Sequence, residues 1–137
     1  MPDPLGRTAF TSGRTTLGVL SSAFTIFGLS LLLQSHRWAS TPAYHVLLLI
    51  LPAFTWGALF LASGLTMAVS VWQYRRRWLL VAAITTGGML TNGWMLAFFV
   101  RYLTSPSTTP ETWVSWMVFD YLLLRVAEPL TSPPPRK

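Results

Sequence analysis

The chain has 137 residues, of which 52% are hydrophobic and only 10% are charged, and its net charge is +6. A soluble domain usually carries about a quarter charged residues, so this composition is typical of a protein that lies in a membrane. The absence of cysteine excludes disulfides, thiol catalysis and thiolate metal sites. The basic residues gather at the ends of apolar segments, which favours contact with lipid headgroups over nucleic-acid binding.

The first apolar run, at about residues 16–34, is predicted to be a membrane-spanning helix. It lies in a stretch without charged residues from Thr15 to Ser35, which is long enough to cross a hydrocarbon core of about 30 Å. Because Arg7 and Arg14 precede it, a cleavable signal peptide is the alternative. Signal sequences have apolar cores of roughly 7–15 residues and end at a small-x-small site. The longer run here, and the polar residues after it, favour a retained helix.

The second run without charged residues, 38–74, is too long for one straight crossing. From Pro42 onward it would measure about 50 Å as a helix at 1.5 Å per residue. Pro52 stands where it would break a helix interior. We therefore expect a short interfacial helix at about 42–51 and a membrane span at about 52–74. One long, kinked and tilted helix is the alternative.

Two further spans are predicted, at about residues 78–100 and 110–128. The third span has no charged residue and is bounded by arginines. The fourth follows Thr109-Pro110-Glu111, a helix start with a hydroxyl cap, a proline in the first turn and an acid that suits the helix dipole. A surface helix is the alternative, although a polar face with a period of 3.6 residues is missing.

Together these segments predict an all-α integral membrane protein. A single domain with four transmembrane helices, and a short interfacial helix before the second span, covers residues 1–130, and residues 131–137 form a disordered Pro-rich tail. With the N-terminus inside, seven basic residues lie on the inner side and two on the outer side. The inner set is Arg7, Arg14, Arg75, Arg76, Arg77, Arg136 and Lys137, and the outer set is Arg37 and Arg101. We expect a multi-pass protein of the cytoplasmic membrane with both termini cytoplasmic.

Asp120 is the most costly residue to place in a membrane, at about 2.5–3.5 kcal/mol on insertion scales. It lies nine residues after Glu111, and Asn92 lies nine residues before Arg101 on the preceding, antiparallel span, so the two depths match. We therefore expect Asp120 to face Asn92 inside the helix bundle. An interhelical hydrogen bond that fixes packing is one interpretation. A proton or ion site, or a polar lumen in an oligomer, is the other.

The remaining polar and aromatic residues have simpler interpretations. The basic inner loop at 75–77 sets the topology, with anionic-lipid or partner binding as a second role. Trp38 and Tyr44 in the outer loop are candidates for contact with a partner protein. His36 and His45 lack the spacing of a helical metal-ligand pair, and no nucleophile–base motif or Gly-rich phosphate loop occurs. We therefore expect no enzyme, metal or cofactor.

Side-chain spacing along the predicted spans indicates some contacts. Arg125 and Glu128 are three residues apart on one helix face and can pair. Small residues recur four apart, which lets helix backbones approach closely, and we interpret them as packing sites within the chain. These pairs are Gly18/Ser22, Ala58/Ala62, Gly64/Ala68 and Ala83/Gly87.

Two stretches, RWASTPAY at 37–44 and LPAFTWGALFLASG at 51–64, carry a resemblance to known proteins. They resemble small four-span membrane proteins of actinobacterial bacteriophages, which combine a Trp–Thr-Pro–Tyr outer loop with a Pro–Trp-Gly–Phe-Leu–Gly second span. The resemblance covers residues 37–64 closely, and the rest only in span count and basic inner loop. It implies a phage origin, and some members are considered holin-like. No catalytic residue comes with the family.

Three functions are compatible with these features. The first is a holin-like protein that accumulates in the cytoplasmic membrane and oligomerises into a lesion, which the short length and the lack of a soluble domain favour. The second is an accessory or exclusion protein that binds a host membrane complex. The third is a small four-helix transporter protomer, in which Asp120 would lie at a dimer interface. The expected partners are thus the lipid bilayer and either further copies of the chain or a host membrane protein.

The basic asymmetry generates a test of topology. A reporter that is active only in the cytoplasm is fused after Lys137 and assayed in whole cells. Four crossings with a cytoplasmic N-terminus predict an active reporter. An inactive reporter, together with activity of a reporter that works only outside the cytoplasm, would contradict four crossings.

Overall fold

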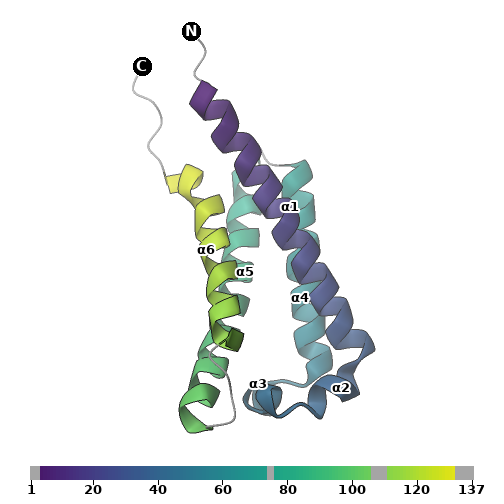
Figure 1. Cartoon of the computed structure of the whole chain (residues 1–137). Helices are drawn as coiled ribbons and strands as arrows, with labels where there is room; N and C mark the ends of the chain where they lie inside the picture. Colours follow the sequence, from purple (N-terminus) through teal and green to yellow (C-terminus); the bar gives the residue numbers. More distant parts are fainter. Residues whose placement is uncertain (1–3, 74–75, 106–110, 132–137) are drawn as a thin grey trace.

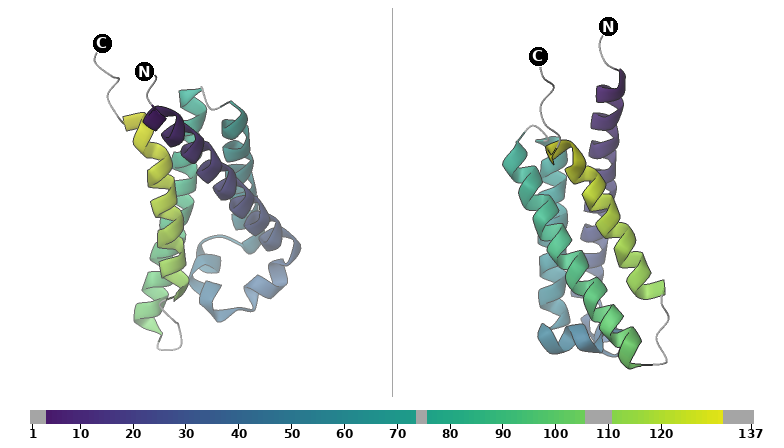
Figure 2. Two further views of the ribbon diagram at one scale, coloured as in Figure 1. Left: turned by 45° about the horizontal axis from the view of Figure 1, so that its top comes forward. Right: turned by 90° about the vertical axis from the view of Figure 1, so that its left-hand side faces the viewer.

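The computed structural model describes residues 4–73, 76–105 and 111–131, and every element within these ranges is helical (Figure 1). Three short helices connect the first and second long helices in the chain, and they lie across one end of the four-helix bundle (Figures 1 and 2). The long helices are α1 (Pro4–Leu33), α4 (Ala53–Trp72), α5 (Arg77–Thr104) and α6 (Glu111–Thr131). The short ones are α2 (Ser35–Ala39), η1 (Pro42–Tyr44) and α3 (His45–Ile50).

Three helical segments of the described chain are long and apolar enough to cross a membrane: Gly13–Leu33, Ala53–Trp72 and Arg77–Thr104. Large apolar side chains also point outward from the bundle, such as Ile26 with 68% and Met89 with 71% of its surface exposed. Such a surface suits lipid and not water. The prediction of an all-helical fold is therefore confirmed for the described residues, and the three apolar helices agree with a membrane protein. The fourth predicted span, α6, is not among the three segments.

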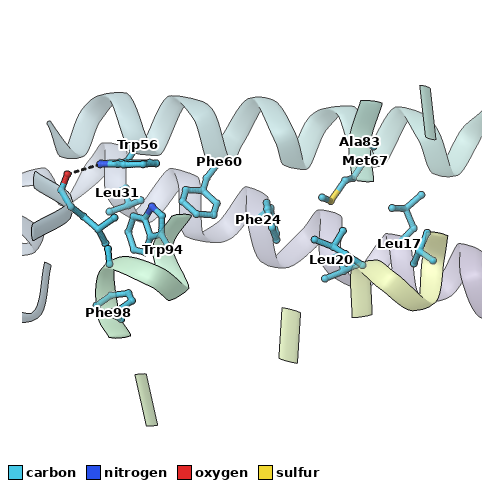
Figure 3. Packing of buried hydrophobic residues seen from close by; sticks show 14 of the residues in the cluster. Leu17, Leu20, Phe24, Leu31, Trp56, Phe60, Met67, Ala83, Trp94 and Phe98 are labelled. Carbon is cyan, nitrogen blue, oxygen red and sulfur yellow. Dashed lines mark hydrogen bonds between the residues drawn. The ribbon is translucent and has the colours of Figure 1, made fainter. Parts of the chain in front are cut away.

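The second apolar run is broken at Leu51 and Pro52. Both residues have extended backbones, with φ −143° and ψ 144° at Leu51 and φ −63° and ψ 153° at Pro52, and α4 begins directly after them. One continuous helix through this point is thus excluded. The indole N–H of Trp56 donates to the backbone oxygen of Leu47 at 3.0 Å, which holds α3 against the start of α4 (Figure 3).

The segment before the break is more divided than the sequence indicated. In place of one helix at 42–51, a 3₁₀ turn at η1 leads into α3. The helix α2, which was not predicted, precedes them and follows α1 almost directly. The predicted tail lies outside the described residues from 132 onward, as do Thr109 and Pro110 of the predicted helix start.

The most extensive contact between helices joins α1 and α4, and it depends on small residues. Ser21 and Gly28 of α1 are seven residues apart, as are Gly57 and Gly64 of α4. Seven residues make about two helical turns, so each pair lies on one face of its helix. In lipid, where apolar side chains gain little by leaving the solvent, such close backbone packing drives helix association.

Distances at the glycines show that the two backbones touch. A Cβ atom built on Gly28 would lie 2.6 Å from the backbone nitrogen of Leu61, and one on Gly64 would lie 2.7 Å from that of Thr25. The hydroxyl of Ser21 donates to the backbone oxygen of Gly64 at 2.8 Å in a buried position. Of the small residues four apart, Gly64 lies at such a backbone contact, Gly87 packs against the side chains of Met67 and Leu123, and Gly18 faces open space.

The core divides along the bundle axis into two halves of different chemistry (Figure 3). Toward the end that carries the first turn of α1, the buried side chains are mostly aliphatic, with Leu17, Leu20 and Met67 fully buried. Toward the end that carries α2 and α3 they are mostly aromatic, with Trp94 and Phe98 almost fully buried. The aromatic half also contains an apolar cavity, whose lining includes Phe24, Phe27 and Phe60.

The α1–α4 contact predicts a selective response to a single methyl group. Gly64→Ala should lower the free energy of unfolding by about 1–3 kcal/mol, because the new Cβ meets backbone atoms that cannot move without separating the helices. Gly18→Ala is the matched control on α1; its Cβ meets nothing within 4 Å, so it should be neutral or stabilise by up to about 1 kcal/mol. Unfolding by dodecyl sulfate in mixed micelles, followed by tryptophan fluorescence, measures both. Equal effects of the two substitutions would contradict the close contact.

Candidate functional site

A polar cluster joins α5 and α6 near the middle of their length. The carboxyl oxygen Oδ1 of Asp120 on α6 accepts a hydrogen bond from Asn92 Nδ2 at 2.7 Å and another from Thr91 Oγ1 at 3.2 Å, both from α5. Asn92 Nδ2 also donates to the backbone oxygen of Gly88, and the single hydroxyl proton of Thr91 is shared between Asp120 and the backbone oxygens of Gly87 and Gly88. The contact between Asp120 and Asn92 that matched depths indicated is therefore present in the structure.

The cluster does not lie inside the bundle, and on this point the prediction was wrong. Thr91 is fully buried, Asp120 is half-buried, and Asn92 is exposed. The side chains thus run from the core to the outer edge of the α5–α6 contact. Counting residues from the helix ends gives the depth of a side chain, but it does not give the direction in which the helix turns it.

The chemistry that this edge shows is hydrogen bonding. No group of three His, Cys, Asp or Glu side chains comes together within the described part of the chain. Oδ2 of Asp120 accepts no hydrogen bond from any residue that the structure describes. It is therefore open to a donor from outside the protomer or to a proton.

The charged residues near the other helix ends lie apart from this cluster. Arg125 Nη1 and Glu128 Oε2 form the expected ion pair on α6, at 2.9 Å, with both side chains about 60% exposed. An exposed pair of this kind contributes little to stability. In the basic loop, Arg75 lies outside the described residues, and the exposed Arg76 and Arg77 stand at the start of α5. That position agrees with a role in topology.

Trp38 and Tyr44, expected as an outward contact surface, are half-buried and pack inward. The indole N–H of Trp38 donates to the backbone oxygen of Ser30 at 3.2 Å, and the two rings meet edge to face with centroids 4.7 Å apart. The Tyr44 ring also contacts Phe98 of α5 at 5.3 Å. Burial raises the pKa of the Tyr44 phenol, so it stays protonated at physiological pH. Both rings thus close the end of the bundle and offer little surface to a partner.

These two rings belong to a larger aromatic cluster that sequence reasoning missed. Trp94 of α5 lies at its centre, with ring centroids 5.1 Å from Phe27, 5.1 Å from Phe60 and 5.2 Å from Trp116. The available signal was an aromatic pair three or four residues apart on each long helix, which puts both rings on one face. The pairs are Phe24/Phe27, Trp56/Phe60, Trp94/Phe98 and Trp116/Phe119.

No family model, no curated protein and no solved structure matches this chain. Its function therefore has to follow from the chemistry of the side chains described above. Two features are candidates for a functional role. One is the polar α5–α6 edge, which would face lipid, and the other is the cavity in the aromatic half of the core.

Proposed function

We propose that this chain is a small, non-enzymatic protein of the cytoplasmic membrane that acts by assembling with copies of itself, in the manner of a holin. The observation that carries the proposal is the position of Asp120 and Asn92, at the outer edge of the α5–α6 contact with Asn92 exposed. A carboxyl and an amide that face lipid are costly. A second copy of the protein that covers this edge removes the cost and supplies a donor to Asp120 Oδ2.

The proposal includes a fourth crossing by α6. This helix has 21 residues, about 31 Å of rise, which matches the hydrocarbon core. Its outward side chains are mainly apolar, among them Val118, Tyr121 and Leu124, each more than half exposed. A surface helix in water would turn such side chains inward. The first turn of α1 and the last turn of α6 lie at the same end of the bundle (Figure 1), which four crossings would put on one side of the membrane.

Glycines on α5 support a contact with another copy. Gly88 and Gly93 lie within the helix, where glycine costs about 1 kcal/mol relative to alanine. A Cβ at either position would meet nothing within 4 Å, so packing within the protomer does not explain them. They flank Asn92 on the outward side of α5, where they would let a neighbouring helix approach closely. The interface would thus combine a polar contact with small residues.

Assembly through this edge leads to a membrane lesion if the copies form a ring. A contact between two different surfaces of identical subunits closes into rings or extends into filaments. In such a ring, polar side chains beside the covered edge, such as the exposed Thr85, would line a path for water and ions. The resemblance at residues 37–64 to phage proteins, some considered holin-like, agrees with this outcome.

The same edge also fits a transporter protomer, because Oδ2 of Asp120 is open to a proton or a cation. The two functions make different demands on this side chain. An ion site needs a carboxyl that ionises, whereas an assembly contact needs only a side chain that can hydrogen-bond to the neighbouring copy. An accessory protein that binds a host complex is favoured less, because the rings of Trp38 and Tyr44 pack inward.

Induced expression in a bacterium, with a potential-sensitive dye, tests the proposal. The wild-type chain should cause an abrupt loss of membrane potential after a lag in which it accumulates. Asp120→Leu should abolish or strongly delay the loss, because leucine at this position cannot hydrogen-bond to the neighbouring copy. Ser22→Leu is the matched control; it removes an exposed hydroxyl of α1 that bonds only within its own helix, and it should behave as wild type.

Asp120→Asn separates the two functions of the edge in the same assay. The amide oxygen can still accept the bonds from Thr91 and Asn92, and the amide nitrogen that replaces Oδ2 can donate to an oxygen of the neighbouring copy, so the loss of potential should persist. Normal accumulation with no loss of potential in this variant alone would favour an ion site. Silent tolerance of the wild-type chain at equal membrane levels would favour an accessory role and contradict the proposed function.

A further inference from the structure

A cavity of about 490 Å³ opens sideways between α1 and α6, in the aromatic half of the bundle. The two helices diverge toward the end that carries α2 and α3 (Figure 1). The walls are almost entirely apolar, with Phe27 from α1 facing Trp116 and Phe119 from α6. Its volume falls within the range of roughly 300–1,000 Å³ that is usual for ligand sites.

The mouth of this cavity faces the surroundings of the bundle and not its interior. Ile26, which lines the cavity from α1, has 68% of its surface exposed. Ala23, one turn earlier, also lines it and is half-buried. The helix α1 carries one of the three segments apolar enough to span a membrane. In a bilayer the mouth therefore opens among acyl chains, and hydrocarbon is the solvent that can enter.

A second hollow, of about 410 Å³, adjoins the first and has a different chemistry. It is lined by Gln34, Arg37, Trp38, Thr41 and Tyr44, and Tyr44 lines the apolar cavity as well. Tyr44 thus stands between an apolar space and a polar one. Amphipathic rings such as Tyr44 and Trp38 favour the level of the membrane at which acyl chains meet headgroups.

Arg37 gives the second hollow a positive charge. The guanidinium is exposed, and no carboxylate whose side chain the structure describes pairs with it. The two such carboxylates are bonded elsewhere, Asp120 to α5 and Glu128 to Arg125. A guanidinium forms its strongest hydrogen bonds with phosphate and carboxylate groups. An anion that binds beside Arg37 would also lie within the hollow lined by the Gln34 amide.

We propose that the two hollows form one site for a single anionic phospholipid, with an acyl chain between α1 and α6 and the phosphate beside Arg37. The hydrocarbon would fill the space that the divergence of α6 leaves beside the aromatic side chains, and the headgroup would neutralise Arg37. The site shares no residue with the Thr91, Asn92 and Asp120 cluster, so it does not depend on the proposed function. The occupant belongs to the leaflet at the end that carries α2 and α3.

Native mass spectrometry of the purified chain, with phosphatidylglycerol and phosphatidylcholine as matched probes, tests the headgroup. One phosphatidylglycerol should bind per protomer, with a preference over phosphatidylcholine of roughly tenfold. Arg37→Gln should remove the preference. Arg76→Gln deletes the same charge at the opposite end of the bundle and should leave the preference intact. Equal losses in the two variants, or no preference in the wild-type chain, would overturn the site.

The acyl chain is tested by filling the cavity and by labelling it. Ala23→Phe should abolish stoichiometric binding of phosphatidylglycerol, whereas Ala58→Phe, on an exposed face of α4, should not. Phosphatidylglycerol with a photoreactive acyl chain should label α1 and α6 at the cavity wall in preference to the exposed Met89 of α5. This experiment uses the wild-type chain, so it does not depend on whether a variant folds. Uniform labelling of all helices would overturn the proposal. So would a dimer that excludes the lipid, because the cavity would then hold a second copy.

Discussion

The backbone contact between α1 and α4 is the constraint on which the rest of the structure depends. At Gly28 and Gly64 the two helices approach so closely that neither position can hold a methyl group without movement. In hydrocarbon, where apolar surface gains little by burial, such contacts and interhelical hydrogen bonds determine which helices pack together. The Ser21 hydroxyl adds such a bond across the same contact. The tightly joined pair then presents one face to α5 and α6.

The helix α6 joins this pair less completely than α5 does. Its fully buried side chains, Leu123 and Val126, lie in its second half, whereas Val114 and Ser115 in its first half are exposed. The second half packs where the core is aliphatic, and Leu123 reaches Gly87 of α5. The first half contacts α1 through the rings of Phe27 and Trp116, with centroids 5.3 Å apart, and leaves the apolar cavity beside this contact. The open side of the bundle is therefore a consequence of where α6 buries its residues.

Both functional proposals follow from what the protomer leaves unsatisfied. At the α5–α6 edge, the open oxygen of Asp120 and the exposed Asn92 require a polar partner that lipid cannot supply. Between α1 and α6, the apolar cavity leaves space beside Trp116 that the protomer does not fill, although this ring packs against Trp94. We propose that a copy of the same chain meets the first need and that a lipid meets the second. The two surfaces differ in chemistry, so each selects its own occupant.

Much of the fold could be predicted from the sequence, because length and apolarity fix where a helix can cross. The break at Pro52 followed from the missing amide hydrogen of proline, and the pairing of Asp120 with Asn92 followed from equal depth. Rotation about the helix axis could not be predicted in the same way, so the exposure of Asn92 was not foreseen. The decisive glycines were also missed in part, because Gly57 and Gly64 are seven residues apart and not four.

The central claim, that copies meet at the α5–α6 edge, is tested most directly by spin labels at single cysteines. The chain has no cysteine, so Leu96→Cys and Leu65→Cys each give one label at an exposed leucine, on α5 and α4 respectively, and Leu96 lies one turn after Asn92. Electron paramagnetic resonance of the chain in lipid bilayers at high dilution would then report the distance between copies. We expect strong dipolar broadening from position 96 and little from position 65. Narrow, uncoupled spectra at both positions would show separate protomers and contradict the account.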